Sequence, residues 1–339
     1  MPMNGFKLLA VGLITVACSS FFAASAERPS STNLSGQVAA PHSQPALPPN
    51  IAAILDHIYS AHTEIAILEA HRMQEQNPNH PLGYILEAEA RWWTIWWDCS
   101  EFKYGISMAR HREKIAADLP YLDLAAKAYV LAEASLVQHD TAEMRLYAGM
   151  ADALTARLYG LRGEARNTAR AGVRARENLQ KALALDPSLA DAYLGLGLYN
   201  YYVDTLSAMA RVLRFFMGIP GGSKEEGIRQ LRRAIADGQL TPALARFYLT
   251  INLHNFDQRY EPALEVISPL VRQYPENPLF RLAQGDLYAK LGRKQEALSA
   301  YQAAEACEVP DEQCRKKVAR LVRESTAALR LRPLDIAGS

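Results

Sequence analysis

The strongest constraint on the fold is a register of small residues and prolines that recurs along the chain. Four segments share relative positions 0, 4 and 7, and three of them have proline at position 12. The four sets are Ala66, Ala70, Met73 and Pro78; Ala175, Leu179, Ala182 and Pro187; Ala263, Ile267, Leu270 and Pro275; and Ala297, Tyr301, Ala304 and Val309. Spacings of three and four place residues on one helix face. Because proline ends a helix, the register predicts a repeated helical unit.

Two further positions keep this register. A small residue follows ten positions after each proline, and a residue with a long side chain lies four positions before the small one. The small residues are Ala88, Gly197 and Gly285, and the long ones are Tyr84, Tyr193 and Arg281. From Ile51 to about Leu331, proline and glycine recur about every 15 to 20 residues, and no segment has the alternation typical of a strand. The body is therefore predicted to be all-α.

These positions resemble the tetratricopeptide repeat, a unit of about 34 residues in two antiparallel helices. The clearest copies are PLFRLAQGDLYAKLGRKQEALSAYQAAE, residues 278–305, and ENLQKALALDPSLADAYLGLGLYNYY, residues 177–202. Residues on the repeat pattern are Gly285, Tyr288, Leu291, Gly292, Ala297, Tyr301 and Ala304 in the first copy, and Ala182, Pro187, Tyr193, Leu196 and Gly197 in the second. The resemblance implies a solenoid of antiparallel helix pairs, with small residues at helix crossings and aromatic rings in the gaps between pairs.

The distances between prolines show where the chain departs from this repeat. Pro187 and Pro275 are 88 residues apart, about 20 more than two units. We predict that residues 203–222 are the insertion and that Ser223 with Glu226 forms a capping box for the next helix. The looser stretch before Pro187 predicts long helices at about residues 82–97, 120–138, 141–160 and 164–185.

The insertion has the pattern of a short amphipathic helix. Thr205 can cap its start, and four apolar residues at helical spacing are the candidate binding residues: Leu206, Met209, Leu213 and Phe216. Burial of this face against the solenoid is the alternative. The flanking runs GLGLYNYY and MGIPGGSKEEGIRQLRRA resemble, over about residues 175–240, one branch of the superfamily. That branch includes eukaryotic proteins of the mitochondrial outer membrane and of inclusion-body clearance, and bacterial relatives.

Residues 1–26 have the pattern of a bacterial-type export signal. Lys7 precedes an apolar run, and the small residues Ala24 and Ala26 suit cleavage by a signal peptidase. The alternative is a lipoprotein signal, in which Cys18 is lipidated and tethers the chain to a membrane. Either scheme places the protein in the periplasm or cell envelope.

The remaining bounds follow from composition. Residues 27–50 are rich in proline and serine and are expected to be a flexible linker. The solenoid is expected over 51–332, with 333–339 as a tail. Export makes a disulfide permissible, and Cys307 and Cys314 are the pair close enough in sequence to consider.

The sequence has no group of residues with the pattern of a catalytic or metal site. Its histidines lack metal-ligand spacing, and nucleophile motifs are absent, so we expect no enzymatic activity, cofactor or metal. All four tryptophans lie close together, at Trp92, Trp93, Trp96 and Trp97. A core position is expected for them, with a ligand pocket or interface anchor as the alternative.

The last predicted helix, Asp311 to Leu331, has a basic face opposite an apolar one and is expected to cap the solenoid. The whole chain has 37 Lys plus Arg against 36 Asp plus Glu, which gives no electrostatic reason to expect nucleic acid as a partner. A solenoid without catalytic residues favours an exported scaffold or adaptor that binds protein or peptide partners on its concave face. The alternative is a lipid- or membrane-surface-binding protein that acts through residues 203–222.

Overall fold

The structure is a computed structural model, and it describes residues 47–102, 106–108, 113–206, 218–309 and 312–331. The predicted export signal with Cys18, nearly all of the predicted linker, and the predicted tail lie outside these ranges. The same is true of Met209, Leu213 and Phe216 in the predicted insertion.

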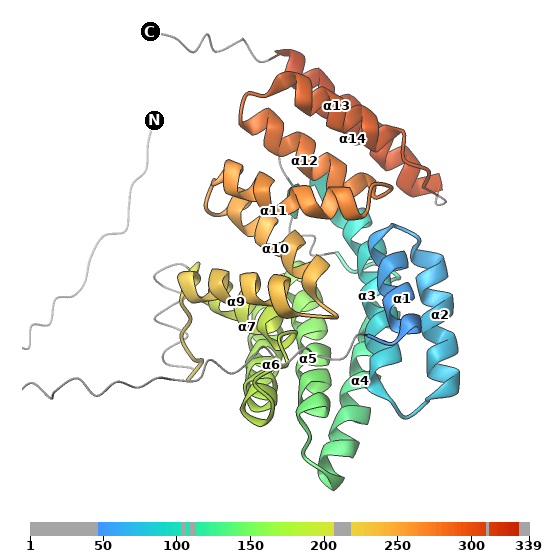
Figure 1. Ribbon diagram of the computed structural model, residues 1–339, viewed down its shortest axis with the longest axis vertical. Coiled ribbons are helices and arrows are strands. Elements are labelled where there is room, and N and C mark those ends of the chain that lie inside the picture. Colours follow the sequence, from blue (N-terminus) through green and yellow to red (C-terminus); the bar gives the residue numbers. More distant parts are fainter. Residues whose placement is uncertain (1–46, 103–105, 109–112, 207–217, 310–311, 332–339) are drawn as a thin grey trace, which may run out of the picture. The chain divides into compact units, whose positions relative to one another are not determined.

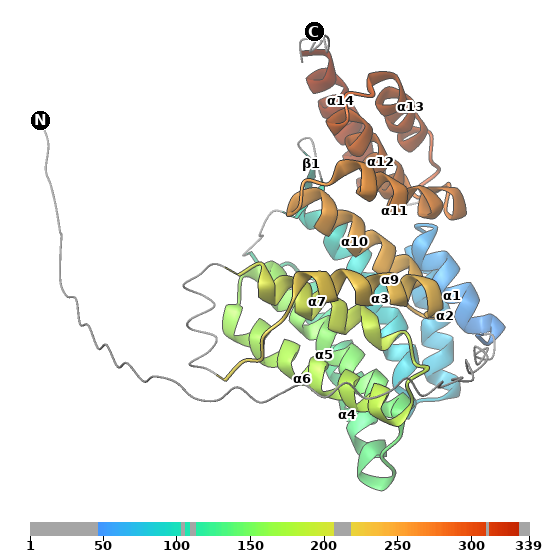
Figure 2. The ribbon, with the colours of Figure 1, turned by 60° about the vertical axis from the view of Figure 1, so that its left-hand side comes forward.

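The described residues form helices that come in consecutive antiparallel pairs, as Figures 1 and 2 show. Helix α14 (Glu312–Leu331) follows the last pair and packs on it. The fold is therefore an all-α, tetratricopeptide-like solenoid with a C-terminal helix, as the register predicted. The pairs are α1 (Pro49–Tyr59) with α2 (Thr63–Gln76), α3 (Pro81–Cys99) with α4 (Asp118–Gln138), α5 (Ala142–Arg162) with α6 (Ala165–Leu185), α7 (Ala192–Asp204) with α9 (Lys224–Asp237), α10 (Pro242–Asn255) with α11 (Tyr260–Gln273), and α12 (Pro278–Lys290) with α13 (Lys294–Glu305).

Local signals in the sequence account for many helix ends. The side chains of Thr141 and Ser223 each accept a hydrogen bond of 3.3 Å from a backbone N–H three residues later, at the starts of α5 and α9. Gly163 ends α5 in the left-handed region, with φ 75°. The four long helices from α3 to α6 begin and end within two residues of the predicted bounds.

One short antiparallel strand pair, which the sequence did not predict, follows α3. It consists of β1 (Ser100–Phe102) and β2 (Ile106–Met108), with Ser100 opposite Met108. Such short strands cannot show the alternation by which a strand is recognised in a sequence. The strand pair lies within the connection between α3 and α4, and β2 contacts α10.

The small residues of the repeat register lie at close contacts between helices. Gly285 lies against the ring of Tyr301, because a Cβ built on it would be 2.5 Å from that ring. Two of the three long side chains in the register make the same kind of contact. Those of Tyr84 and Arg281 donate hydrogen bonds to the carbonyl oxygens of Pro78 and Pro275, six residues earlier. The register alanines are buried in the core: Ala66, Ala175, Ala182, Ala263, Ala297 and Ala304.

Two glycines, Gly197 and Gly227, lie where α7 and α9 cross closely. A Cβ on Gly227 would be 2.7 Å from the carbonyl oxygen of Gly197 and 2.8 Å from the backbone nitrogen of Tyr201. Both neighbours are backbone atoms, which cannot rotate away. We expect Gly227→Ala to lower the free energy of unfolding by about 1–3 kcal/mol, because a methyl group forces the helices apart.

Urea unfolding of matched variants tests this prediction. Gly172→Ala is the control, because its Cβ would meet only a ring atom of Tyr199, at 3.8 Å. Alanine favours helix over glycine by up to about 1 kcal/mol, so the control should be as stable as the wild-type chain or more so. Equal stability of Gly227→Ala and wild type would contradict the close crossing.

The helix pairs also make contacts between distant parts of the sequence. The side-chain nitrogen of Asn277 donates a 2.8 Å hydrogen bond to the carbonyl oxygen of Tyr59, and the rings of Tyr59 and Tyr274 are 5.7 Å apart. In a simple solenoid each repeat touches only its neighbours. Here the first helix pair also contacts the segment between α11 and α12.

Candidate functional site

The tryptophans of α3 pack in the space between α3 and two later helices, α10 and α12. The Trp93 ring is 5.0 Å from the ring of Phe247 on α10 and 6.0 Å from the ring of Phe280 on α12. Trp92, Trp93 and Trp96 are all buried. These three side chains are therefore core residues, and no partner segment can enter between α3, α10 and α12 without displacing their rings.

A buried ion pair joins α3 to α5 beside these rings. Nη2 and Nη1 of Arg157 donate to the two carboxylate oxygens of Glu89, at 2.8 and 3.1 Å, and Nε donates to the Tyr121 hydroxyl at 3.1 Å. The Arg157 guanidinium lies 4.2 Å from the Trp92 ring centroid. Burial raises the pKa of Tyr121 well above its ordinary value. Every charged group of the network has a partner, as a structural core site requires.

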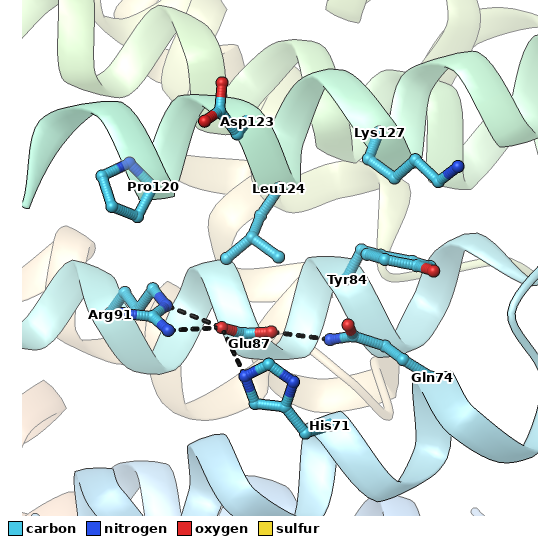
Figure 3. Close-up of a pocket in the computed structure, with 9 residues that line it drawn as sticks. All are labelled: His71, Gln74, Tyr84, Glu87, Arg91, Pro120, Asp123, Leu124 and Lys127. Carbon is cyan, nitrogen blue, oxygen red and sulfur yellow. Dashed lines mark hydrogen bonds and ion pairs between the residues drawn. The ribbon is translucent and has the colours of Figure 1, made fainter.

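An open groove lies between α2 and α4, with α3 as its floor (Figure 3). It has a volume of about 270 Å³. Figure 3 shows that its side chains come from all three helices, with Leu124 of α4 and His71 of α2 both pointing toward Glu87 of α3. The lining residues are His71, Gln74, Tyr84, Glu87, Arg91, Pro120, Asp123, Leu124 and Lys127.

A buried carboxylate, Glu87, holds the floor of the groove together. Its oxygens accept hydrogen bonds of 2.7 Å from Nε of Arg91 and from the side-chain amide of Gln74, and Nε2 of His71 lies 3.2 Å away. These partners satisfy the carboxylate from α2 and α3, as Figure 3 shows. The floor is therefore a polar layer whose buried charge is already neutralised.

The helices on either side of the groove expose large apolar side chains. The structure describes eight such exposed residues, and five of them lie on α2 and α4. They are Ile65 (45% exposed) and Leu68 (51%) on α2, and Leu119 (66%), Val130 (60%) and Val137 (86%) on α4. We call these five residues the apolar rim.

The rim on α4 forms a single row along the helix. The step from Leu119 to Val130 is close to three whole helical turns, and the step from Val130 to Val137 is close to two. The face of α4 that packs on the core has Tyr121 near its start and then three alanines: Ala125, Ala128 and Ala132. The row was not predicted from the sequence. The sequence signal that could have revealed the exposed row is that α4 has two apolar rows, of which the one that is largely alanine is buried.

The structure describes only one of the four candidate binding residues of the insertion. Leu206 is exposed just after α7. Thr205 is the C-cap of α7, and its hydroxyl donates a 2.8 Å hydrogen bond back to the carbonyl oxygen of Tyr202. The helix that Thr205 is predicted to start falls outside the described residues. A role of the insertion in binding stays a prediction.

The predicted disulfide between Cys307 and Cys314 is not present in this structure. Cys307 follows the end of α13 and is a free thiol whose Sγ lies 3.2 Å from the carbonyl oxygen of Ala303 in that helix. Burial raises the pKa of this thiol, which disfavours the thiolate that disulfide formation needs. Cys314 is a buried residue of α14.

Known proteins share little with this chain. No family model matches it, and no curated protein matches it with significance. Among solved structures, the crystal structure of yeast Tom70 is similar over 83% of this chain and 89% of that chain, with 9% sequence identity and a TM-score of 0.28. Similarity at this level does not indicate a function.

The described ranges lack two further kinds of site. No helix there is both long and apolar enough to cross a membrane. Nor do three or more His, Cys, Asp or Glu side chains of those ranges come together as metal ligands would.

Proposed function

We propose that this chain is an exported helical-repeat scaffold that binds a protein partner in the groove between α2 and α4. The observation that supports this is the apolar rim on the two helices that form the walls of the groove; its five residues lie outside the set that lines the groove itself. A chain that buries its core well rarely leaves several large apolar side chains together on its surface unless another molecule covers them.

The shape of the site favours a partner helix. An amphipathic helix that lies in a groove presents apolar residues at spacings of three, four and seven. The rim offers exposed apolar side chains on both helices that flank the groove, and the hydrogen bonds of Glu87 leave no buried charge in the floor to be neutralised by the ligand.

The location outside the cytoplasm rests on the sequence alone. Residues 1–26 have the pattern of an export signal, and we therefore expect the partner among proteins of the periplasm or cell envelope. This proposal places the partner in the groove, and binding on the concave face, which the sequence favoured, stays a prediction.

Site-specific photocrosslinking in the native organism tests the groove. A photoreactive phenylalanine analogue at Val137, the most exposed rim residue, should form a crosslink to one reproducible protein. The same analogue at Leu185, an exposed apolar residue on α6, should not capture that protein. Mass spectrometry of the crosslinked bands identifies the partner.

Charge placed on the rim should then abolish capture. Val130→Asp with Val137→Asp should weaken binding of the identified partner at least about tenfold, since each lost apolar contact is worth about 1.5 kcal/mol or more. Leu185→Asp is the matched control. Equal capture by the rim variant and wild type would overturn the groove as the binding site.

A further inference from the structure

The balanced charge of the whole chain conceals a strongly basic helix. Residues 165–185, which form α6, contain one acidic residue, Glu177, and five basic ones: Arg166, Arg170, Arg174, Arg176 and Lys181. The acidic residues that offset them lie elsewhere in the chain. A partner of α6 therefore meets a local positive field that the net charge does not reveal.

Three of these arginines form a row at four-residue spacing, and we call Arg166, Arg170 and Arg174 the arginine row. All three are exposed. Arg174 is the only one with an ion pair among the residues described, through Nε to Asp152 on α5 at 3.0 Å. Arg166 and Arg170 have no ion-pair partner in that part of the chain.

Two acidic groups near α6 are engaged by other residues. Glu164, at the start of α6, accepts a 2.6 Å hydrogen bond from Asn167 and lies 3.4 Å from Lys114. Asp140, beyond the other end of the row, is bound by Arg145. Glu177 is the one acidic residue within α6. Arg166 and Arg170 are thus guanidinium groups without a counter-charge among the described residues, while Arg174 is paired with Asp152.

The spacing of the row selects the shape of its ligand. Four residues of helix rise about 6 Å, so the three arginines span about 12 Å. Carboxylates at four-residue spacing on a second helix repeat at the same distance and stay in register over all three. Carboxylates at alternate positions of a strand repeat at about 6.6 Å and drift by roughly 1 Å over the row.

We propose that the arginine row of α6 docks an acidic helix of the partner protein, with Glu or Asp side chains at four-residue spacing. This inference rests on the proposed scaffold function and adds a second, charge-selective contact to it. A lipid surface fits less well, because membrane-surface helices pair their cations with large apolar side chains that insert. The row contains no such side chain, and the exposed Leu185 lies at the far end of α6.

Fluorescence anisotropy with a synthetic peptide tests the proposal on the full chain. The probe is a labelled helical peptide with Glu at positions i, i+4 and i+8, and a second peptide of the same composition has its Glu residues scattered around the helix. The aligned peptide should bind about tenfold more tightly than the scattered one, and its affinity should fall as salt is raised. Equal affinities would overturn the proposal.

Charge reversal locates the contact. Arg166→Glu with Arg170→Glu should weaken binding of the aligned peptide at least about tenfold. Lys316→Glu with Arg320→Glu on α14 is the matched control: the spacing is the same, but these cations already face Glu312 and Glu324, and binding should be unchanged. Circular dichroism melting shows whether each variant is folded. Loss of binding in both variants would show that the peptide responds to the net charge of the chain and not to the arginine row, which would contradict the proposal.

Two further outcomes separate this proposal from its alternatives. Phosphatidylglycerol vesicles that bind through the arginine row, while the aligned peptide does not, would assign α6 to lipid instead. If the arginine-row variant still captures the partner found by crosslinking and the rim variant does not, the scaffold function stands and the acidic dock fails. Loss of capture in both would support both surfaces.

Discussion

Replacing Arg157 by methionine is expected to lower the free energy of unfolding by about 3–5 kcal/mol. The substitution keeps most of the length of the side chain but removes its charge. Glu89 is buried and would then lose both hydrogen bonds from the guanidinium. A largely buried carboxylate without its counter-charge is strongly destabilising, because little water is there to solvate it.

Urea unfolding followed by tryptophan fluorescence measures this effect. The four tryptophans lie between residues 92 and 97, so the signal reports the region around the ion pair. Adding Glu89→Gln to Arg157→Met removes the uncompensated charge and should recover a large part of the loss. Arg293→Met is the control, because it breaks an exposed pair with Glu296 and exposed pairs contribute little to stability. A cost for Arg157→Met as small as that of the control would show that the buried pair is not sealed from water.

The helix pairs could be predicted because their signals are local and repeated. Ala263, Ile267 and Leu270 share one helix face, and the proline five residues later stops the helix. The spacing of 0, 4 and 7 occurs four times, three of them with the proline, so an uncertain assignment in one copy is decided by the others. Ser223 shows the same for helix starts: its side chain accepts from the backbone of Glu226, as its sequence position indicated.

Contacts between distant residues could not be predicted. Oδ1 of Asp191 accepts hydrogen bonds from the backbone nitrogens of Gln239, Leu240 and Thr241, at 2.9 to 3.0 Å, which fixes the start of α10 to the start of α7. Burial raises the pKa of this carboxyl, although these hydrogen bonds act to lower it. The donors come from a later helix pair, and no periodicity of the sequence marks them as partners of Asp191.

The repeat register also contains the positions of two buried carboxylates, but it does not show that they are buried. Ala88 and Gly285 hold the same register position, and each is followed by an acidic residue, Glu89 and Asp286. Both acids are buried, whereas an acid in an ordinary exposed position would be solvated. The register reveals the shared position, but whether each carboxylate has a cation nearby depends on helices from other parts of the fold.

Asp286 has no cation bound to it among the described residues. Oδ1 accepts a 2.8 Å hydrogen bond from the Tyr301 hydroxyl, and Oδ2 has no hydrogen-bond partner in the same part of the chain. Burial raises the pKa of this carboxyl from 3.8 to about 7, although the Tyr301 hydrogen bond and the charge of Lys290 act in the opposite direction. Near neutral pH the native chain therefore still holds a proton that the unfolded chain has released.

This difference sets the direction of the pH dependence. Below pH 4 the carboxyl is protonated in both states and has no effect on stability. Between about pH 4 and pH 7 only the native state keeps the proton, so stability falls as pH rises, by about 1.4 kcal/mol per unit. Above about pH 7 the native state carries a buried charge and the full loss of about 4 kcal/mol is present.

Asp286→Asn should remove this loss, because the amide cannot ionise and can still accept from Tyr301. The variant is expected to be more stable than wild type by up to about 4 kcal/mol at pH 8 and nearly equal to it at pH 4. Urea unfolding of both proteins from pH 4 to pH 9 checks this. Taking the difference between them at each pH cancels the titration of every other group.

Asp186→Asn provides a control of opposite sign. The Ser188 hydroxyl and backbone N–H bind the Asp186 carboxylate and lower its pKa. Its contribution to stability is therefore present above the unfolded pKa and lost as pH falls, so this variant should be the less stable one at neutral pH and converge with wild type in acid. If the difference between Asp286→Asn and wild type were the same at pH 4 and pH 8, the pKa of the Asp286 carboxyl would have to be the same in the native and the unfolded state. The close contact of Gly285 with the Tyr301 ring would then have to open enough to admit water.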